Sequence, residues 1–311
     1  MKRNVADVLR RGLDSTIANW PVIVLRLAEN LVFAAIIIGS VVAAIVPAAV
    51  AAGLSKDDIL NSTDPGGAVV EWMIGHLMLF VWIFALAFVV LGVLIAIHSF
   101  VEGASTQIYV DGERNSLRGG VSGRAGFNAF SIDRWLAGGA ASWWRIFWLY
   151  NFAWSVGLLF VLVPLIFTIG GMLVISDSVG KIVIGCAGLV IAVMVMVPVF
   201  IVTSIWCTKA ITICVARSLP ARESLRLGWR AFRMDLGRHL AVAVIIFVVM
   251  LALNSLFSGF SIPFTITEHK LPTAAIMFAP IRLVAGVFQS VASAAVGSFL
   301  LACFVSMTEE P

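Results

Sequence analysis

Long apolar runs dominate the chain, and charged residues fall between them. A helix needs about 20 apolar residues to cross a bilayer, and six runs without a charged residue are at least that long. Because these runs are continuous and do not alternate with a period of two, they predict helices and not the strands of a barrel. The six runs are 31–54, 77–97, 146–175, 182–208, 240–267 and 283–308.

Each odd-numbered run follows a stripe of apolar residues at helical spacing, with charged residues on the other faces. Such a helix lies flat in the headgroup region with its aromatic residues buried. The first stripe includes Leu13 and Trp20, the second follows Ser131 as a candidate N-cap, and the third includes Trp229 and Phe232. The predicted surface helices cover about 4–20, 131–143 and 222–237.

The predicted fold class is therefore all-α: a polytopic membrane protein with six transmembrane helices arranged as three hairpins, each preceded by a cytoplasmic amphipathic helix. The glycine-rich stretch 111–126 predicts a mobile loop. No segment between the spans is large enough for a separate domain, so residues 1–311 are expected to form one domain. The predicted spans are about 22–52, 70–100, 145–175, 181–208, 239–260 and 281–306.

Composition excludes a soluble protein. The chain is 61% hydrophobic and 12% charged, whereas an ordinary soluble domain has roughly 25% charged residues. Its mean hydropathy is +1.04. This number of charged residues is too small to form the polar outer surface that a soluble protein of this length needs. Lipid must therefore cover much of the surface of the chain.

The distribution of Lys and Arg predicts the orientation. Seventeen of the 21 lie in the segments ending at 26, between 114 and 145, and between 209 and 238, and only four lie on the other side. By the positive-inside rule, both termini are expected on the cytoplasmic side of the membrane. The basic pI then indicates anionic inner-leaflet lipid as a partner and not nucleic acid. The residues expected on the lipid surface are Arg222, Arg226, Arg230 and Arg233.

Charged and amide groups at the start of the first run are open to two interpretations. If the helix enters the bilayer at Trp20, Glu29 lies about 13 Å deep and needs a partner such as Arg26 or Lys209. If the hydrocarbon begins near Leu31, Glu29 lies among the headgroups and belongs to an ordinary interfacial ion pair.

Under the deeper interpretation, other polar groups at a comparable depth join Glu29 in a cavity that opens to the cytoplasm. Under the other, each finds a local partner, for example His98 with Glu102 one turn away. The candidate cluster consists of Arg26, Glu29, Asn30, His98, Glu102, Asn151 and Lys209.

Small residues repeat at every fourth position of the last run and form a smooth face for close helix packing. The expected partner is either the small residues Ala35, Gly39 and Ala43 of the first span or another subunit. The four cysteines have no metal-ligand spacing and are expected to be packing residues. The packing stripe consists of Gly286, Ser290, Ala294, Ser298 and Ala302.

No catalytic motif is found: there is no HExxH, no Gly-x-Ser-x-Gly and no phosphate-binding glycine loop. His98 and Glu102 are two side chains capable of acid-base chemistry or metal binding, but two ligands are too few for a metal site. We therefore expect no enzyme activity, no cofactor and no metal.

The stretches "FVEGASTQIYVDGERNSLRGG", "FSIDRWLAGGAASWWRIFWLYN" and "ESLRLGWRAFRMDLGRHLAVAV" resemble a family of uncharacterised bacterial six-span membrane proteins. The resemblance extends to the membrane domain sometimes fused to glycerophosphodiester phosphodiesterases. It carries over no functional residue, and the chain has no room for the fused enzyme's barrel. The expected function is a scaffold or accessory subunit of a membrane assembly, with other membrane subunits or a second copy as partners. The alternative is a transporter or flippase for a lipid-like or small polar solute.

Overall fold

The computed structural model describes residues 3–52, 75, 77–118, 123–175, 177–270 and 274–310. Six helices in this part of the chain are long and apolar enough to cross a membrane, and no strand occurs in it. The predicted all-α polytopic fold class is confirmed. The elements are α1 (Val5–Ala18), α2 (Pro21–Ala52), α5 (Leu77–Arg118), the 3-10 helix η1 (Arg124–Phe127), α6 (Ile132–Val174), α7 (Ser178–Arg217), α8 (Ala221–Met234), α9 (Leu236–Lys270) and α10 (Ala274–Ser306).

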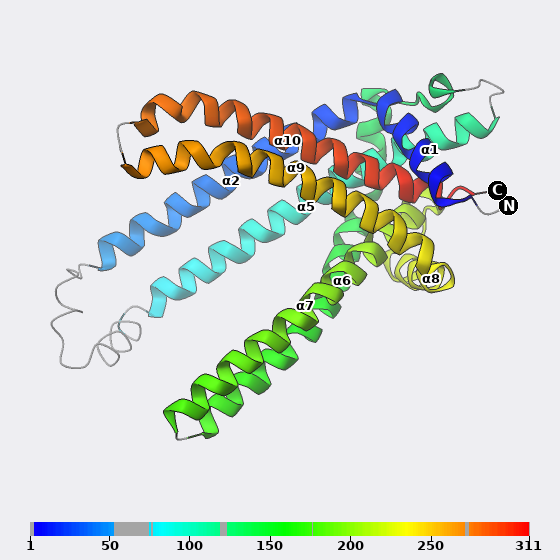
Figure 1. Cartoon of the computed structure of the whole chain (residues 1–311). Coiled ribbons are helices and arrows are strands. Elements are labelled where there is room, and N and C mark those ends of the chain that lie inside the picture. Colours follow the sequence, from blue (N-terminus) through cyan, green and yellow to red (C-terminus); the bar gives the residue numbers. More distant parts are fainter. Residues whose placement is uncertain are drawn as a thin grey trace. The chain divides into compact units, whose positions relative to one another are not determined.

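The chain divides into two compact units. The first contains residues 1–27 and 99–311, and the second contains residues 28–98. In the first unit α6 lies beside α7 and α9 beside α10, which gives two of the predicted hairpins (Figure 1). In the second unit, α2 and α5 meet at Phe33 and His98, whose rings are 6.3 Å apart. The prediction of one domain stays a prediction.

Two of the three predicted surface helices are separate elements. The Asn4 side chain caps α1 by accepting a hydrogen bond from the Asp7 N–H at 2.7 Å. The helix ends before Pro21, which is a favoured first residue for the following helix. The second separate element is α8, which ends at Met234 and not at residue 237.

The predicted surface helix over 131–143 needs correction, because it is the beginning of α6. Ser131 does cap this helix, as predicted, by accepting from the Arg134 N–H at 3.3 Å. The helix then continues because no proline or glycine lies between Ala140 and Val156.

The predicted loop over 111–126 is also partly helical. α5 runs through to Arg118, and Glu113 within this stretch is almost completely buried. Gly123 begins the described part again with a positive φ of 87°, which glycine adopts without strain. Residues 119–122 lie outside the described part of the chain.

The packing stripe of α10 is buried against the protein along only part of its length. Ala294, Ser298 and Ala302 are buried, whereas Ser290 is half-buried and Gly286 is exposed. Ala302 packs in a core cluster that includes Val22 at the start of α2 and Tyr109 of α5. The proposed partner residues of the first span, Ala35, Gly39 and Ala43, are all exposed.

Close approaches hold α1 and α8 to their neighbours. A Cβ on Gly12 of α1 would lie 3.2 Å from the Cα of Cys303 in α10. A Cβ on Gly228 of α8 would lie 2.9 Å from the Cα of Ala210 in α7. Glycine at these points lets one backbone pack directly on the other, which fixes both surface helices at the end of the unit where the chain termini meet.

Candidate functional site

Arg26 and Glu102 form a buried ion pair between α2 and α5 of the first unit. The Arg26 Nη2 donates to Glu102 Oε2, and both side chains are about nine-tenths buried. A Cβ atom added to Gly297 of α10 would lie 3.6 Å from Arg26 Nη1, so α10 passes close to the pair. The pairing of Arg26 with Glu29 that the sequence suggested would join residues of different units, and it stays a prediction.

Glu29 pairs with His98 in the second unit. The Glu29 Oε1 lies 2.7 Å from His98 Nδ1, and the carboxylate side chain is 4% exposed whereas the imidazole is 36% exposed. The pairing of His98 with Glu102, one of the two alternatives from the sequence, would join residues of different units and stays a prediction. Asn30, the next residue, is exposed. A carboxylate and an imidazole at this distance can share a proton, which is the chemistry of a proton relay.

Asn151 and Lys209 have partners within the first unit. The Asn151 side-chain amide donates to the Phe147 carbonyl of its own helix at 2.8 Å, as the local interpretation predicted. Lys209 is buried and its Nζ donates to Thr308 Oγ1 at 2.9 Å. Asn151 is thus paired within α6, and Lys209 is paired with a residue just after the end of α10.

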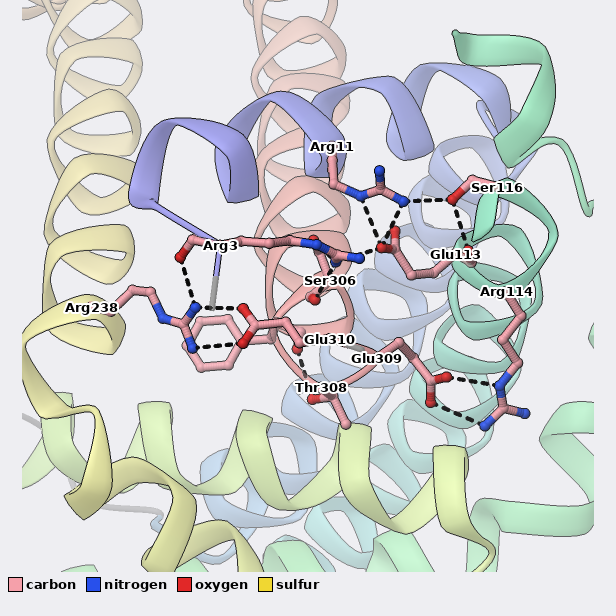
Figure 2. A network of polar contacts seen from close by, with 11 residues as sticks. Arg3, Arg11, Glu113, Arg114, Ser116, Arg238, Ser306, Thr308, Glu309 and Glu310 are labelled. Atoms are coloured by element: carbon pink, nitrogen blue, oxygen red, sulfur yellow. Dashed lines mark hydrogen bonds and ion pairs between the residues drawn. The ribbon is translucent and has the colours of Figure 1, made fainter. Parts of the chain in front are cut away.

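A second polar cluster lies where the two chain ends meet, and we call it the terminal network (Figure 2). At its centre, Glu113 of α5 accepts from Arg3 Nη1 at 2.6 Å and from Arg11 Nε at 2.9 Å. Arg3 also donates to the Ser306 carbonyl at 2.6 Å. The terminal network consists of Arg3, Arg11, Glu113, Arg114, Ser116, Arg238, Ser306, Glu309 and Glu310.

The last residues of the chain complete this network. Glu309 accepts two hydrogen bonds from Arg114, at 2.9 and 3.0 Å, in the bidentate geometry that favours Arg–carboxylate pairs. Arg238 of α9 holds Glu310 and also donates to the Arg3 carbonyl at 2.8 Å. The network therefore joins both chain ends to α5 and α9.

Sequence reasoning did not find the terminal network. Its ion pairs join residues 72 to 195 positions apart, and no periodic pattern reports such a separation. One signal was available: Glu113, Glu309 and Glu310 are acidic residues on the side where basic residues gather, so each was a candidate for an ion pair.

The four arginines predicted for the lipid surface are exposed on one side of α8. The opposite side packs on the protein, with Leu225, Gly228 and Phe232 buried. The Trp206 indole N–H of α7 donates to the Leu225 carbonyl at 2.9 Å, which fastens the start of α8. The apolar face of this helix is thus covered by α7 and its neighbours, and the arginines point away from them.

On α1, the residues against the protein are Val8, Gly12, Ser15 and Thr16. Three residues of its predicted apolar stripe, Leu13, Ile17 and Trp20, are exposed. Contact of this exposed stripe with lipid, as expected of an interfacial helix, stays a prediction.

The residues that the structure describes contain no group of three His, Cys, Asp or Glu placed to hold a metal ion. All four cysteines are free, and three are buried as packing residues. No protein-family model matches the chain, and neither a curated protein nor a solved structure shows detectable similarity to it. The resemblance to the phosphodiesterase-associated membrane domain stays a prediction.

Proposed function

We propose that this protein is a non-enzymatic scaffold or accessory subunit of a membrane assembly. The observation that supports this is the internal pairing of the buried charges. Arg26 pairs with Glu102, and Glu113 accepts from both Arg3 and Arg11. Removing one partner from such a buried pair costs about 3–5 kcal/mol, so these groups stabilise a fixed arrangement of helices.

We further propose the inner membrane of a bacterium as its location, with both termini in the cytoplasm. The excess of Lys and Arg on the side of the termini supports this orientation. In it, the exposed arginines of α8 face anionic headgroups, each contributing about 1 kcal/mol of attraction. The arginine face of α8 would then be available on the cytoplasmic side for a membrane partner.

Purification under mild conditions tests the scaffold role. The protein is crosslinked in native membranes, extracted in a gentle detergent and weighed by native mass spectrometry. We expect a complex of defined stoichiometry with another membrane subunit or a second copy. The same complex should be recovered in equal amount from membranes that contain the unaltered protein and from membranes that contain the Glu223→Gln variant. Glu223 is an exposed acid of α8 and serves as a matched control. A lone monomer in every preparation would contradict the proposal.

The Glu29–His98 pair supports a second candidate function, a transporter or flippase. A nearly buried carboxylate beside a partly exposed imidazole is suited to proton-coupled movement of a lipid-like or small polar solute. Flipping can be measured in vesicles that contain a fluorescent phospholipid. A membrane-impermeant quencher removes the fluorescence of the outer leaflet, so flipping is seen as an additional loss of fluorescence from the inner leaflet. The expected result is flipping by the natural chain and by Glu223→Gln, and its loss in Glu29→Gln. Equal rates in the presence and absence of protein would exclude flipping of that lipid.

A further inference from the structure

A groove of about 360 Å³ lies on the first unit where α6 meets the start of α8. Its walls are Trp144, Trp148 and Phe152 of α6 together with Ala221 of α8, and its one charged lining residue is Arg145. From Ile146 to the end of α6 there is no charged residue. Arg145 therefore marks the point where a polar helix start gives way to an apolar span.

The aromatic wall is already ordered. Trp148 stacks on Phe152 with 5.6 Å between ring centroids, and Trp144 stacks on Phe147 at 5.5 Å. Trp144, Trp148 and Phe152 are nevertheless exposed. Tryptophans gather at the headgroup level of membranes because the ring is apolar and its N–H is polar. The wall thus offers rigid apolar surface at low conformational cost.

Arg145 is held in place by neutral acceptors. Its Nη2 donates to the Ala141 carbonyl at 2.8 Å and its Nη1 to the Leu219 carbonyl at 3.4 Å. A guanidinium has five N–H donors, and no carboxylate in the described part of the chain pairs with this one. Arg222, the residue after Ala221, is also exposed. One end of an apolar groove thus carries positive charge without a matching anion.

We propose that this groove binds one anionic phospholipid. The headgroup phosphate accepts hydrogen bonds from Arg145, and an acyl chain lies against Trp148 and Phe152. A span from a second copy could also cover the apolar wall of the groove. The apolar runs of this chain, however, contain no acidic residue that would pair with Arg145. The proposal does not depend on the scaffold role, since a monomer would bind the lipid equally well.

Brominated phospholipids test the site because bromine quenches tryptophan only on contact. The full chain is reconstituted in phosphatidylcholine, and brominated phosphatidylglycerol or brominated phosphatidylcholine is added at increasing mole fraction. We expect half-maximal quenching at a mole fraction about fivefold lower for the anionic lipid, which corresponds to about 1 kcal/mol for one basic residue. Arg145→Gln should remove this preference, and Arg145→Lys should keep most of it.

Two controls locate the signal. Lys181→Gln removes an exposed charge near the start of α7, outside the groove and the α8 arginine face, and should leave the preference unchanged. Trp148→Phe keeps the aromatic wall but removes a fluorophore, so the anionic component of the quenching should fall. Equal quenching by both lipids, or a preference that survives in Arg145→Gln, would overturn the proposal. So would quenching that disappears as dimer forms at higher protein content, because a second copy would then occupy the groove.

Discussion

Single charged residues in the interior of this protein are stabilised by partners of opposite charge on other helices. Arg26 and Glu102 lie on α2 and α5 and pair within a core that contains Val22 and Val101. The attraction compensates for the loss of hydration only while both charges are present. The pair therefore stabilises the arrangement of the two helices more than it stabilises the fold as a whole.

The first prediction concerns this pair. Glu102→Gln should lower the free energy of unfolding by about 3–5 kcal/mol, because it removes the carboxylate that pairs with the buried Arg26 guanidinium. The double variant Arg26→Met with Glu102→Leu should lose much less, since neither charge then remains. Unfolding by a denaturing detergent, followed by circular dichroism, measures both. Glu223→Gln, at an exposed position, should change nothing, and a double variant as unstable as the single one would refute the argument.

The sequence predicted which residues are special here but not how they pair. Arg26, Glu29, His98 and Glu102 were identified because charge is costly near an apolar run. Their partners were sought one turn away in the same helix or, for Glu29, also at Lys209 of another span. The pairs that the structure shows within each unit join residues 76 and 69 positions apart. They depend on the register of α2 against α5, which local spacing does not report.

At the scale of the element, the contact of α8 with α7 depends on the absence of a side chain at Gly228. We predict that Gly228→Ala will destabilise the protein by about 1–3 kcal/mol, since the new Cβ would lie 2.9 Å from the Ala210 backbone. Gly237→Ala is the matched control, because a Cβ there has no atom within 4 Å. Thermal unfolding in detergent should show a lower midpoint for the first variant only, and equal midpoints would mean that α8 is not fixed by this contact.

Helices were the most predictable feature, and their ends the least. Apolar runs of about 20 residues have few alternatives in lipid, so all six spanning helices were found. The starts and stops were predicted well where a proline is present, as at Pro21. They were missed where a polar helix joins an apolar one without interruption, as around Trp143 in α6 and Glu113 in α5. Charge alone does not end a helix.

At the scale of the whole molecule, the terminal network joins the two chain ends to α5 and α9. Glu309→Gln combined with Glu310→Gln should remove the pairs with Arg114 and Arg238. We expect faster hydrogen exchange in α1 and at the end of α10, because both are held through Arg3 and Ser306. Asp133→Asn, an exposed acid at the start of α6, should leave exchange unchanged. Unaltered exchange in the double variant would show that apolar packing alone holds the ends.

The network also makes a prediction about topology. Arg238 contacts both the Arg3 carbonyl and Glu310, so the first and last described residues must lie on one side of the membrane. Green fluorescent protein folds in the cytoplasm but not when exported unfolded through the general secretion pathway. Fusions at either end should therefore fluoresce, whereas alkaline phosphatase inserted at Asp177, between α6 and α7, should be active outside. Fluorescence from only one end would contradict an even number of crossings. Dark fusions at both ends would reverse the proposed orientation while leaving the fold intact.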